Sequence, residues 1–312
     1  MNYKEIYNDW ISNPNFDKET KAELLKLKEN DAEIEDRFYC ELEFGTAGLR
    51  GVIGAGTNRM NIYTVRKATQ GLANYIIKQG QQSRGVAIAY DCRNMSPEFA
   101  EETALCLAAN GIKAHVFESL RPIPELSFTV LHLGCIAGVT ITASHNPPEY
   151  NGYKVTWEDG AQLTDPHDTG VMEEVASIPD YSLVKTIDKK SAIESGLYIT
   201  IGKEIDDAYI AALKTHITNP EILKYAKDLN IVYTPLNGTG NILVRRLLSE
   251  IGFDNIHVVP EQEAPDGNFP TLKSPNPEVP EAFEYALSLA KKIDSDLIIG
   301  TDPDADRLRS IC

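Results

Sequence analysis

The chain has 312 residues, of which 42% are hydrophobic and 24% are charged, as is typical of a globular protein with room for two domains. Its formal net charge of -16 argues against nucleic acid as the main partner, because phosphate backbones bind clustered lysine and arginine side chains. No apolar run approaches the ~20 residues that cross a bilayer, so we expect no membrane partner either.

The cysteines and the first residues bear on the compartment in which the protein works. The five cysteines are scattered and lack the spacing of a metal site, which favours reduced thiols over a disulfide framework. Residues 1–10 are polar and mixed in charge, unlike a signal peptide. We therefore expect a cytoplasmic protein.

The spacing of apolar residues predicts an α/β protein. Residues 2–36 are rich in lysine and glutamate and are expected to form exposed helices, and residues 44–51 form a glycine-rich loop too polar for a core strand. Strands and helices then alternate in two runs, which is typical of mainly parallel, mixed sheets covered by helices. The expected elements are a helix at 61–79, a strand at 85–91, a helix capped by Ser96 with Pro97 in its first turn, a strand at 112–117, a helix at 124–133, a strand at 136–142, a helix at 202–216, a strand at 230–234, a helix at 240–252, a strand at 255–259, a helix at 281–293 and a strand at 296–300.

These two runs predict two domains. Between them, residues 159–197 are polar and have little periodicity, and we place the domain boundary near their end. The chain is therefore expected to form one domain at 1–200 and another at 201–312. In the second domain, the proline-rich residues 265–278 are expected to form an ordered loop rather than a flexible linker.

A serine follows the buried strand at 136–142. Ser144 lies in a turn where Pro147 and Pro148 prevent regular backbone hydrogen bonding. A hydroxyl on a rigid turn at a strand end is well placed to act as a nucleophile or a phosphate carrier. The alternative is that Ser144 or Asn146 only caps a helix or closes a turn, as serine and asparagine usually do.

Three carboxylates follow the strand at 296–300. Asp302, Asp304 and Asp306 alternate along a tight loop, and such crowding is costly unless a cation or an arginine is present. Hard oxygen ligands of this kind select Mg²⁺. A calcium EF-hand does not fit, because its glycine is missing and its bidentate glutamate would fall beyond Cys312. A solvated acidic turn stays open, as does a phosphatase in which Asp302 is the nucleophile.

Taken together, the motifs resemble those of the α-D-phosphohexomutases, the family of phosphoglucomutases and phosphomannomutases. The order of the matches is the family order, and their spelling looks most like the bisphosphate-dependent phosphoglucomutase branch that also contains phosphopentomutases. Asn237 departs from the pattern, since many members carry histidine there, and we assign it no role. The matching segments are the phosphoserine loop at 142–154, the metal loop at 302–307, the first active-site loop at 44–51 and two further motifs at 234–238 and 265–278.

This resemblance implies a phosphosugar mutase. Ser144 would carry the phosphate that moves between the 1- and 6-positions of a hexose, most simply glucose, with glucose 1,6-bisphosphate as activator and intermediate. Asp302, Asp304 and Asp306 would hold Mg²⁺ together with an oxygen of the phosphorylated Ser144. The partner would be a small-molecule sugar phosphate, and the sequence does not indicate the oligomeric state.

The resemblance also implies roles for four basic residues. Arg50 and Arg307 would contact phosphate oxygens, and His145 and Lys154 are the candidates for moving the proton of the sugar hydroxyl. The alternatives are that Lys154 is a salt-bridged surface lysine and that His145 is a turn residue only.

Two expectations concern how these groups are arranged. Because phosphoserine chemistry requires a nearby cation, we expect Ser144 to lie close to the loop at 302–306 although the two are far apart in sequence. Asp91 and Arg93, at the end of another strand, are expected to form a structural ion pair rather than to act in catalysis.

Members of this family continue through a third domain and a fourth that grips the distal phosphate, and neither is expected within these residues. Residues 308–312 are too short and too polar for the strand that the family pattern has there, so the second domain is expected to lack its last strand. We expect a truncated chain without the full enzyme's activity. The alternatives are a phosphomannomutase, a phosphopentomutase, or a non-catalytic fragment that binds Mg²⁺ or a phosphosugar.

Overall fold

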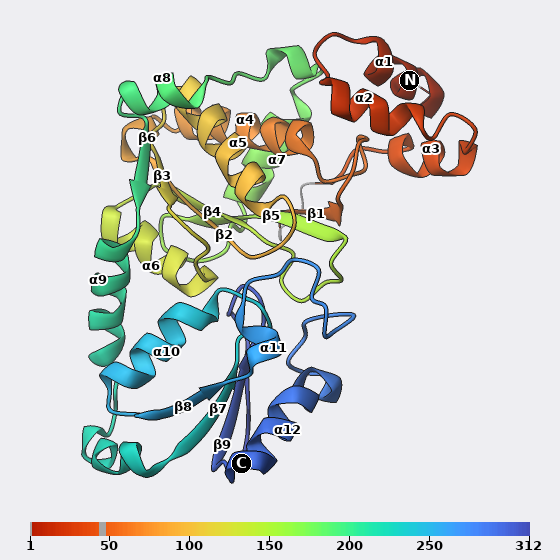
Figure 1. Ribbon diagram of the computed structural model, residues 1–312. Coiled ribbons are helices and arrows are strands. Elements are labelled where there is room, and N and C mark those ends of the chain that lie inside the picture. The colour runs from red at the N-terminus through yellow and green to blue at the C-terminus, as the bar shows by residue number, and fades with distance from the viewer. Residues whose placement is uncertain (1, 44–47) are drawn as a thin grey trace.

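Two sheets, each covered by helices, form the protein, and a computed structural model describes residues 2–43 and 48–312 of it (Figure 1). The first sheet has six strands in the order β1-β5-β4-β2-β3-β6, and the second has four in the order β10-β9-β7-β8. Both sheets are mixed, with parallel strands at the centre and antiparallel pairing toward one edge. This arrangement confirms the predicted α/β class.

Apolar composition explains the centre of the first sheet. All five residues of β4 (Ala137–Ile141) are buried, as expected of a parallel strand that is covered on both faces. Helices α4, α5 and α7 pack on one face, and α6 packs on the other (Figure 1). The remaining elements of this unit are β1 (Leu49–Val52), α4 (Ile62–Lys78), β2 (Val86–Tyr90), α5 (Ser96–Ala109), β3 (Ala114–Phe117), α6 (Ile123–Leu133), β5 (Tyr150–Trp157), α7 (His167–Ala176), α8 (Lys189–Glu194) and β6 (Tyr198–Ile201).

The helix predicted at 61–79 begins where a cap is available. The side chain of Asn61 accepts hydrogen bonds from the backbone N–H groups of Tyr63 and Thr64, which would otherwise be unpaired at the start of α4. Val65, Leu72 and Ile76 share one face of the helix and are fully buried. The cap and the apolar stripe therefore both place α4 on the sheet.

Several expectations for this unit were wrong. Residues 49–52 are not loop but strand β1, paired antiparallel with β5, while residues 44–47 lie outside the described part of the chain. The eight-residue strand β5 was not expected, nor were α7 and α8 within the polar residues 159–197. Helix α5 is preceded by Met95 as its cap residue, and Ser96 instead donates its hydroxyl to Asp91. The strands and helices that were not expected share one reason: short elements that pair or pack on one side need little apolar periodicity.

The N-terminal helices were predicted correctly as largely exposed helices, but each also buries one or two apolar residues, which was not expected. Trp10 is 1% exposed, and its ring stacks on Phe16 with a centroid distance of 4.2 Å. Tyr63 of α4 and Tyr181 close this aromatic cluster against the first unit. The three helices, which lie beside β1 in Figure 1, are α1 (Tyr3–Ser12), α2 (Lys18–Leu25) and α3 (Asp31–Phe38).

The second unit follows helix α9 (Lys203–Lys214), which runs along the side of the molecule (Figure 1). Helix α12 covers one face of its sheet, where Ala286 and the preceding Phe283 share a core cluster with Ile298 of β9, and α10 lies on the other face. The elements are β7 (Asn230–Thr234), α10 (Gly240–Glu250), β8 (Asn255–Val258), α11 (Pro260–Glu263), α12 (Glu284–Ile293), β9 (Leu297–Thr301) and β10 (Leu308–Ile311). Short 3-10 helices lie at Gln82–Arg84, Tyr181–Leu183, Pro220–Asp228 and Pro280–Phe283.

The expectation that residues 308–312 form no strand was wrong. Residues Leu308–Ile311 form β10, which pairs antiparallel with β9 from Leu308 opposite Thr301 to Ile311 opposite Ile298. Leu308 is exposed and Ile311 packs partly against the core. An edge strand is held by backbone hydrogen bonds, so polar side chains on its open side do not prevent it. None of the helices in the described part of the chain has both the length and the apolar composition needed to cross a membrane.

The packing of the N-terminal helices leads to a stability prediction. Replacing Trp10 by alanine should lower the free energy of unfolding by about 3–5 kcal/mol, because it empties the centre of a closed aromatic cluster. Tyr39 at the end of α3 is 63% exposed, and Tyr39→Ala should change the free energy of unfolding by no more than about 0.5 kcal/mol. Urea denaturation followed by circular dichroism measures both. Equal effects of the two substitutions would show that these helices do not pack as described.

Candidate active site

The loops that follow β4 and β9 meet between the two units. The hydroxyl of Ser144 lies 3.1 Å from Oδ2 of Asp302, although 158 residues separate them in the chain. The predicted closeness of Ser144 to the acidic loop is therefore confirmed. Both loops leave the carboxyl ends of their sheets, where the side chains that bind ligands are usually placed in α/β proteins.

Local hydrogen bonds orient the serine. Ser144 has a left-handed backbone with φ of 53°, and its N–H donates to the hydroxyl of Thr142 at 2.8 Å. Thr142 in turn donates to Asp91 at 2.6 Å and lies 3.2 Å from Asp304 of the acidic loop. A non-glycine residue persists in this conformation only where its surroundings hold it, so the direction of the Ser144 side chain is fixed by the fold.

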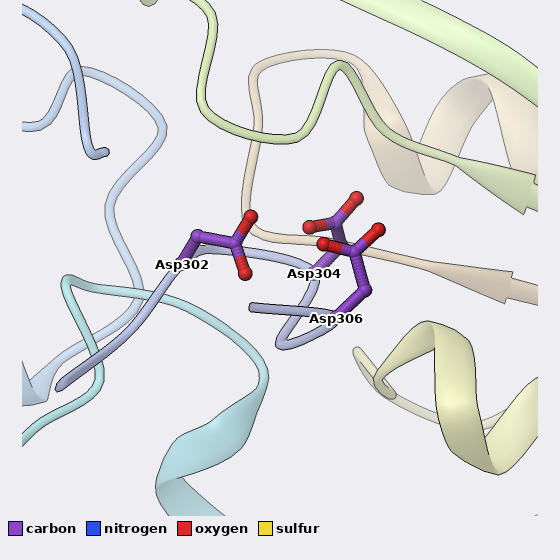
Figure 2. Close-up of side chains that lie close together, drawn as sticks. All are labelled: Asp302, Asp304 and Asp306. Carbon is purple, nitrogen blue, oxygen red and sulfur yellow. The ribbon is translucent and has the colours of Figure 1, made fainter. Parts of the chain in front are cut away.

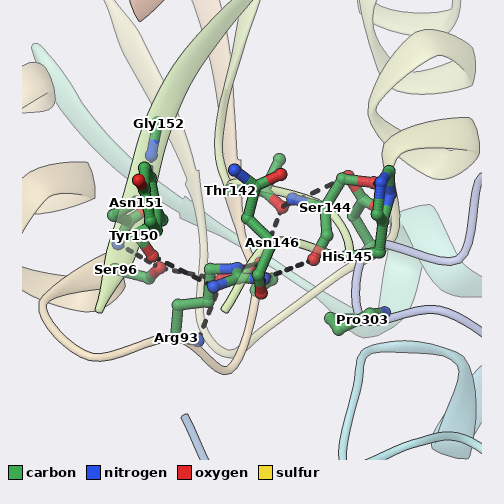
Figure 3. A network of polar contacts seen from close by, with 12 residues as sticks. Arg93, Ser96, Thr142, Ser144, His145, Asn146, Tyr150, Asn151, Gly152 and Pro303 are labelled. Atoms are coloured by element: carbon green, nitrogen blue, oxygen red, sulfur yellow. Dashed lines mark hydrogen bonds and ion pairs between the residues drawn. The ribbon is translucent and has the colours of Figure 1, made fainter. Parts of the chain in front are cut away.

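Arg93 holds the loop that carries Ser144 (Figure 3). Its side chain is fully buried and lies 3.4 Å from Asp91, which confirms the predicted structural ion pair. The guanidinium also donates at 2.5–3.0 Å to four backbone carbonyls of the loop, those of Ser144, Asn146, Pro147 and Tyr150. Sequence reasoning missed this second task. The sequence feature that could have indicated these hydrogen bonds was an arginine just after β2, which pairs with β4.

The three aspartates turn toward one space (Figure 2). One oxygen of each carboxylate lies within 4.8 Å of the others, and Asp302 and Asp304 are fully buried while Asp306 is partly exposed. Burial, together with the charges of Asp304 and Asp306, raises the pKa of Asp302 to about 9. Burial also acts to raise the pKa of Asp304, but the Lys154 ammonium and hydrogen bonds from Lys154, Asp302 and Thr142 together lower that pKa. Without a cation, a proton therefore resides on Asp302.

The donor set of this loop fits a hard divalent cation. Oδ1 of Asp304 is buried and has no hydrogen-bond partner among the described residues, which is costly for a carboxylate unless something else binds it. Carboxylate oxygens that converge on one space are the ligands Mg²⁺ prefers. The residues present thus fit such an ion, with Asp304 as the deepest ligand.

Lys154 reaches the acidic loop from β5. Its Nζ donates to Asp304 at 2.9 Å and lies 3.7 Å from Asp306, with 17% of the side chain exposed. The lysine is ion-paired, but with the acidic loop rather than on the open surface. Because β5 pairs with β4 and places Lys154 opposite Thr140, the sheet register sets its position.

His145 faces the same hydroxyl as the acidic loop. Its Nδ1 lies 3.2 Å from Oγ of Ser144. Burial lowers the pKa of His145, and the positive charges of Arg307 and Arg50 lower it further. The imidazole is therefore neutral at pH 7 and can accept a proton.

The two arginines lie at the rim. Arg50 on β1 donates to the side chain of Asn146 at 3.2 Å. The backbone N–H of Arg307 donates to Asp302 at 3.1 Å, while its partly exposed guanidinium lies 3.3 Å from Glu278. Every residue that the sequence singled out as a site residue thus lies in or beside one region between the units.

The motif at 234–238 packs closely against the acidic loop. A Cβ at Gly238 would lie 2.4 Å from Cα of Pro303, so only glycine allows this approach. The carbonyl of Pro303 accepts hydrogen bonds at 2.8 Å from both the N–H and the hydroxyl of Thr239. Asn237, which was assigned no role, donates its side-chain amide to the carbonyl of Ala264 at 2.7 Å.

The chain is similar in sequence to known proteins. Two family models match the chain in order, "Phosphoglucomutase/phosphomannomutase, alpha/beta/alpha domain I" at residues 41–182 and "domain II" at residues 207–311. A phosphoglucomutase of Staphylococcus saprophyticus is 38% identical over 299 residues, 96% of this chain and 53% of that protein. A phosphoglucomutase of Staphylococcus epidermidis is 40% identical over 86% of this chain and 48% of its own length. The chain therefore spans about half the length of these curated relatives.

Solved structures show the same fold. A Thermus thermophilus protein assigned as a phosphomannomutase has a TM-score of 0.73 at 24% identity, covering 87% of this chain and 57% of its own. Parafusin, a phosphoglucomutase from Paramecium, has a TM-score of 0.66 at 17% identity, covering 86% of this chain and 52% of its own. With both units matched in order by models of one family, the chain belongs to the phosphoglucomutase/phosphomannomutase family.

Proposed function

We propose that this chain carries a transferable phosphate on Ser144 and serves a phosphohexomutase that moves phosphate between the 1- and 6-positions of glucose. The observation that carries the proposal is the 3.1 Å distance between the Ser144 hydroxyl and Asp302, across two units of the fold. The family membership and the phosphoglucomutase relatives support it. We also propose that the units correspond to domains at 1–200 and 201–312, and that the protein works in the cytoplasm.

The proposed chemistry is an exchange of one phosphoryl group. In one direction a sugar hydroxyl loses its proton as its oxygen attacks the phosphorus on Ser144, the bond from phosphorus to Oγ breaks, and Oγ regains a proton. In the other direction the Ser144 hydroxyl loses its proton as Oγ attacks a phosphate of glucose 1,6-bisphosphate, the bond from phosphorus to the sugar oxygen breaks, and that oxygen takes up a proton. When bound by Asp302, Asp304 and Asp306, Mg²⁺ would neutralise the negative charge that gathers on the moving group.

Two residues are proposed to move protons. His145 is neutral at pH 7 and its Nδ1 lies 3.2 Å from Oγ of Ser144, within reach of the proton exchanged there. Lys154 lies 2.9 Å from Asp304 on the same side of the site. We propose that Lys154 moves the proton of the sugar hydroxyl.

Arg50 and Arg307 are proposed to bind phosphate oxygens. Arginine presents a planar fork of donors that matches the geometry of phosphate. Both side chains stand at the rim, where a sugar phosphate would enter, and each now contacts a group that a phosphate could displace, Asn146 for Arg50 and Glu278 for Arg307.

The half-reaction provides a direct test. Incubation of the purified chain with glucose 1,6-bisphosphate and Mg²⁺ should add one phosphoryl group by intact mass, and Ser144→Ala should not gain it. This step needs only residues that the structure describes. A phosphate that hydroxylamine removes and that Asp302→Asn, but not Ser144→Ala, abolishes would instead make Asp302 the carrier.

Removal of one ligand should separate metal binding from folding. Asp304→Asn should raise the Mg²⁺ dissociation constant at least about tenfold, because it removes the deepest hard ligand. The metal-free stability should change by no more than about 1 kcal/mol, since loss of the Lys154 pair is offset by the lower cost of ionising Asp302 once its neighbour carries no charge. Calorimetric titration and urea denaturation measure the two effects, and Asp228→Asn on the surface removes the same charge as a control. A large loss of metal-free stability would make the aspartates a structural network.

The pKa of Asp302 predicts the pH dependence of metal binding. In the folded state this group keeps its proton up to about pH 9, whereas in the unfolded chain it loses it near pH 4. Between these values, metal-free stability should therefore fall as the pH rises, and Mg²⁺ should bind more tightly, by up to about tenfold per pH unit. Titration calorimetry in buffers of different ionisation enthalpy should show about one proton released per Mg²⁺ bound near pH 7. Affinity that is independent of pH from about 6 to 9, with no proton release, would contradict this assignment.

A further inference from the structure

The proline-rich segment at 265–278, called here the docking loop, leaves the second unit and lies against the first. Close to the N-terminal end of the docking loop, a Cβ on Gly267 would lie 2.5 Å from the backbone nitrogen of Asn94 and 2.8 Å from the carbonyl of Cys92. Beside it, the side chain of Asn94 donates to Asn268 at 3.0 Å. Backbone therefore touches backbone across the boundary between the units, and no side chain fits between them.

Phe269 of the docking loop covers Arg93. Its ring is 1% exposed, and Cζ of Arg93 lies 5.1 Å from the ring centroid, a distance at which a cation is attracted to an aromatic face. Phe269 has φ of 46°, a left-handed conformation that a bulky residue rarely adopts. Such a backbone persists only where surrounding contacts over-determine it. Here hydrogen bonds with Asp266 and Leu272 hold the backbone of Phe269 within the docking loop, and its ring faces Arg93 of the first unit.

Arg93 connects the docking loop to the serine. Its guanidinium lies over the ring of Phe269 and donates to the four carbonyls of the Ser144 loop described above. The far end of the docking loop meets the same loop, because the Ser274 hydroxyl donates to the carbonyl of His145. Glu278, at the end of the segment, contacts Arg307 beside the acidic loop.

We infer that the docking loop positions the phosphate-carrying serine: Gly267 and Phe269 of the second unit hold Arg93, and Arg93 holds the backbone of the Ser144 loop opposite the aspartates. None of these residues touches the reacting hydroxyl or the ligand oxygens, so they are positioning residues rather than catalytic ones. The consequence for metal binding rests on the proposed function, whereas the restraint on the loop does not.

Phe269→Leu tests the inference with little change in apolar volume, because it removes only the aromatic face. Amide hydrogen exchange at Ser144, Asn146 and Tyr150, whose N–H groups bond within the loop, should speed up by about tenfold or more. The Mg²⁺ dissociation constant should rise severalfold although every carboxylate is kept. Both measurements use the full chain with Mg²⁺ alone as the probe.

Phe283→Leu is the matched control. Phe283 is equally buried in the second unit and lies under Arg309 at 5.6 Å, away from the Ser144 loop. It should lower overall stability by a similar amount and leave exchange in the Ser144 loop unchanged. Equal exchange in the two variants would show that Phe269 only contributes to packing, which would overturn the inference.

Gly267→Ala provides a second test should Phe269→Leu unfold. It inserts a methyl group between the two backbones and should also speed exchange at the same three amides. Gly71→Ala is its control, because a Cβ there would lie 2.8 Å from the backbone nitrogen of Val175, within the first unit. If the unaltered chain binds no Mg²⁺, the proposed function fails, while the exchange comparison still decides the positioning role.

Discussion

Negative charge crowded into a space that excludes water is the constraint on which the rest of the site depends. Asp302 and Asp304 are fully buried, and a phosphate on the nearby Ser144 would add further charge. The cost of burying such groups must be met by a proton, a cation or a basic side chain. The fold provides two of these, the proton on Asp302 and the ammonium of Lys154. It also leaves one oxygen of Asp304 without a hydrogen-bond partner among the described residues, so that a cation could bind there.

The same constraint explains why the site is divided between two units. Ser144 and Lys154 belong to the first sheet and the aspartates to the second, and the contacts across the boundary include polar groups on both sides. The backbone N–H of Ile123 also donates to the carbonyl of Asp304 at 3.0 Å. A buried polar boundary of this kind tolerates few relative positions of the two units, because each displacement leaves a donor or a charge unpaired.

Local pattern predicted most of the fold but not its edges. The central strands were found because a strand covered on both faces is mostly apolar, as β4 is. Strands β1, β5, β6 and β10 were not found, and β10 was excluded. Strand β6 pairs parallel with β3 and the other three pair antiparallel, and all four take their stability from the neighbouring strand. Backbone hydrogen bonds to a partner leave no mark in a strand's own side chains. The aromatic cluster around Trp10 escaped for a similar reason, since its members come from separate segments.

By itself, the sequence determined the chemical groups of this site. A serine on a proline-bounded turn and three alternating aspartates are local features, and their chemistry follows from residue type and spacing. Only the tertiary structure decided how they meet: that Lys154 reaches Asp304, that Arg93 holds the serine loop, and that Phe269 of the second unit covers Arg93. Those contacts join residues up to about 180 positions apart, so no local pattern encodes them. The burial that they create sets which charges are paired and which carboxylate keeps its proton.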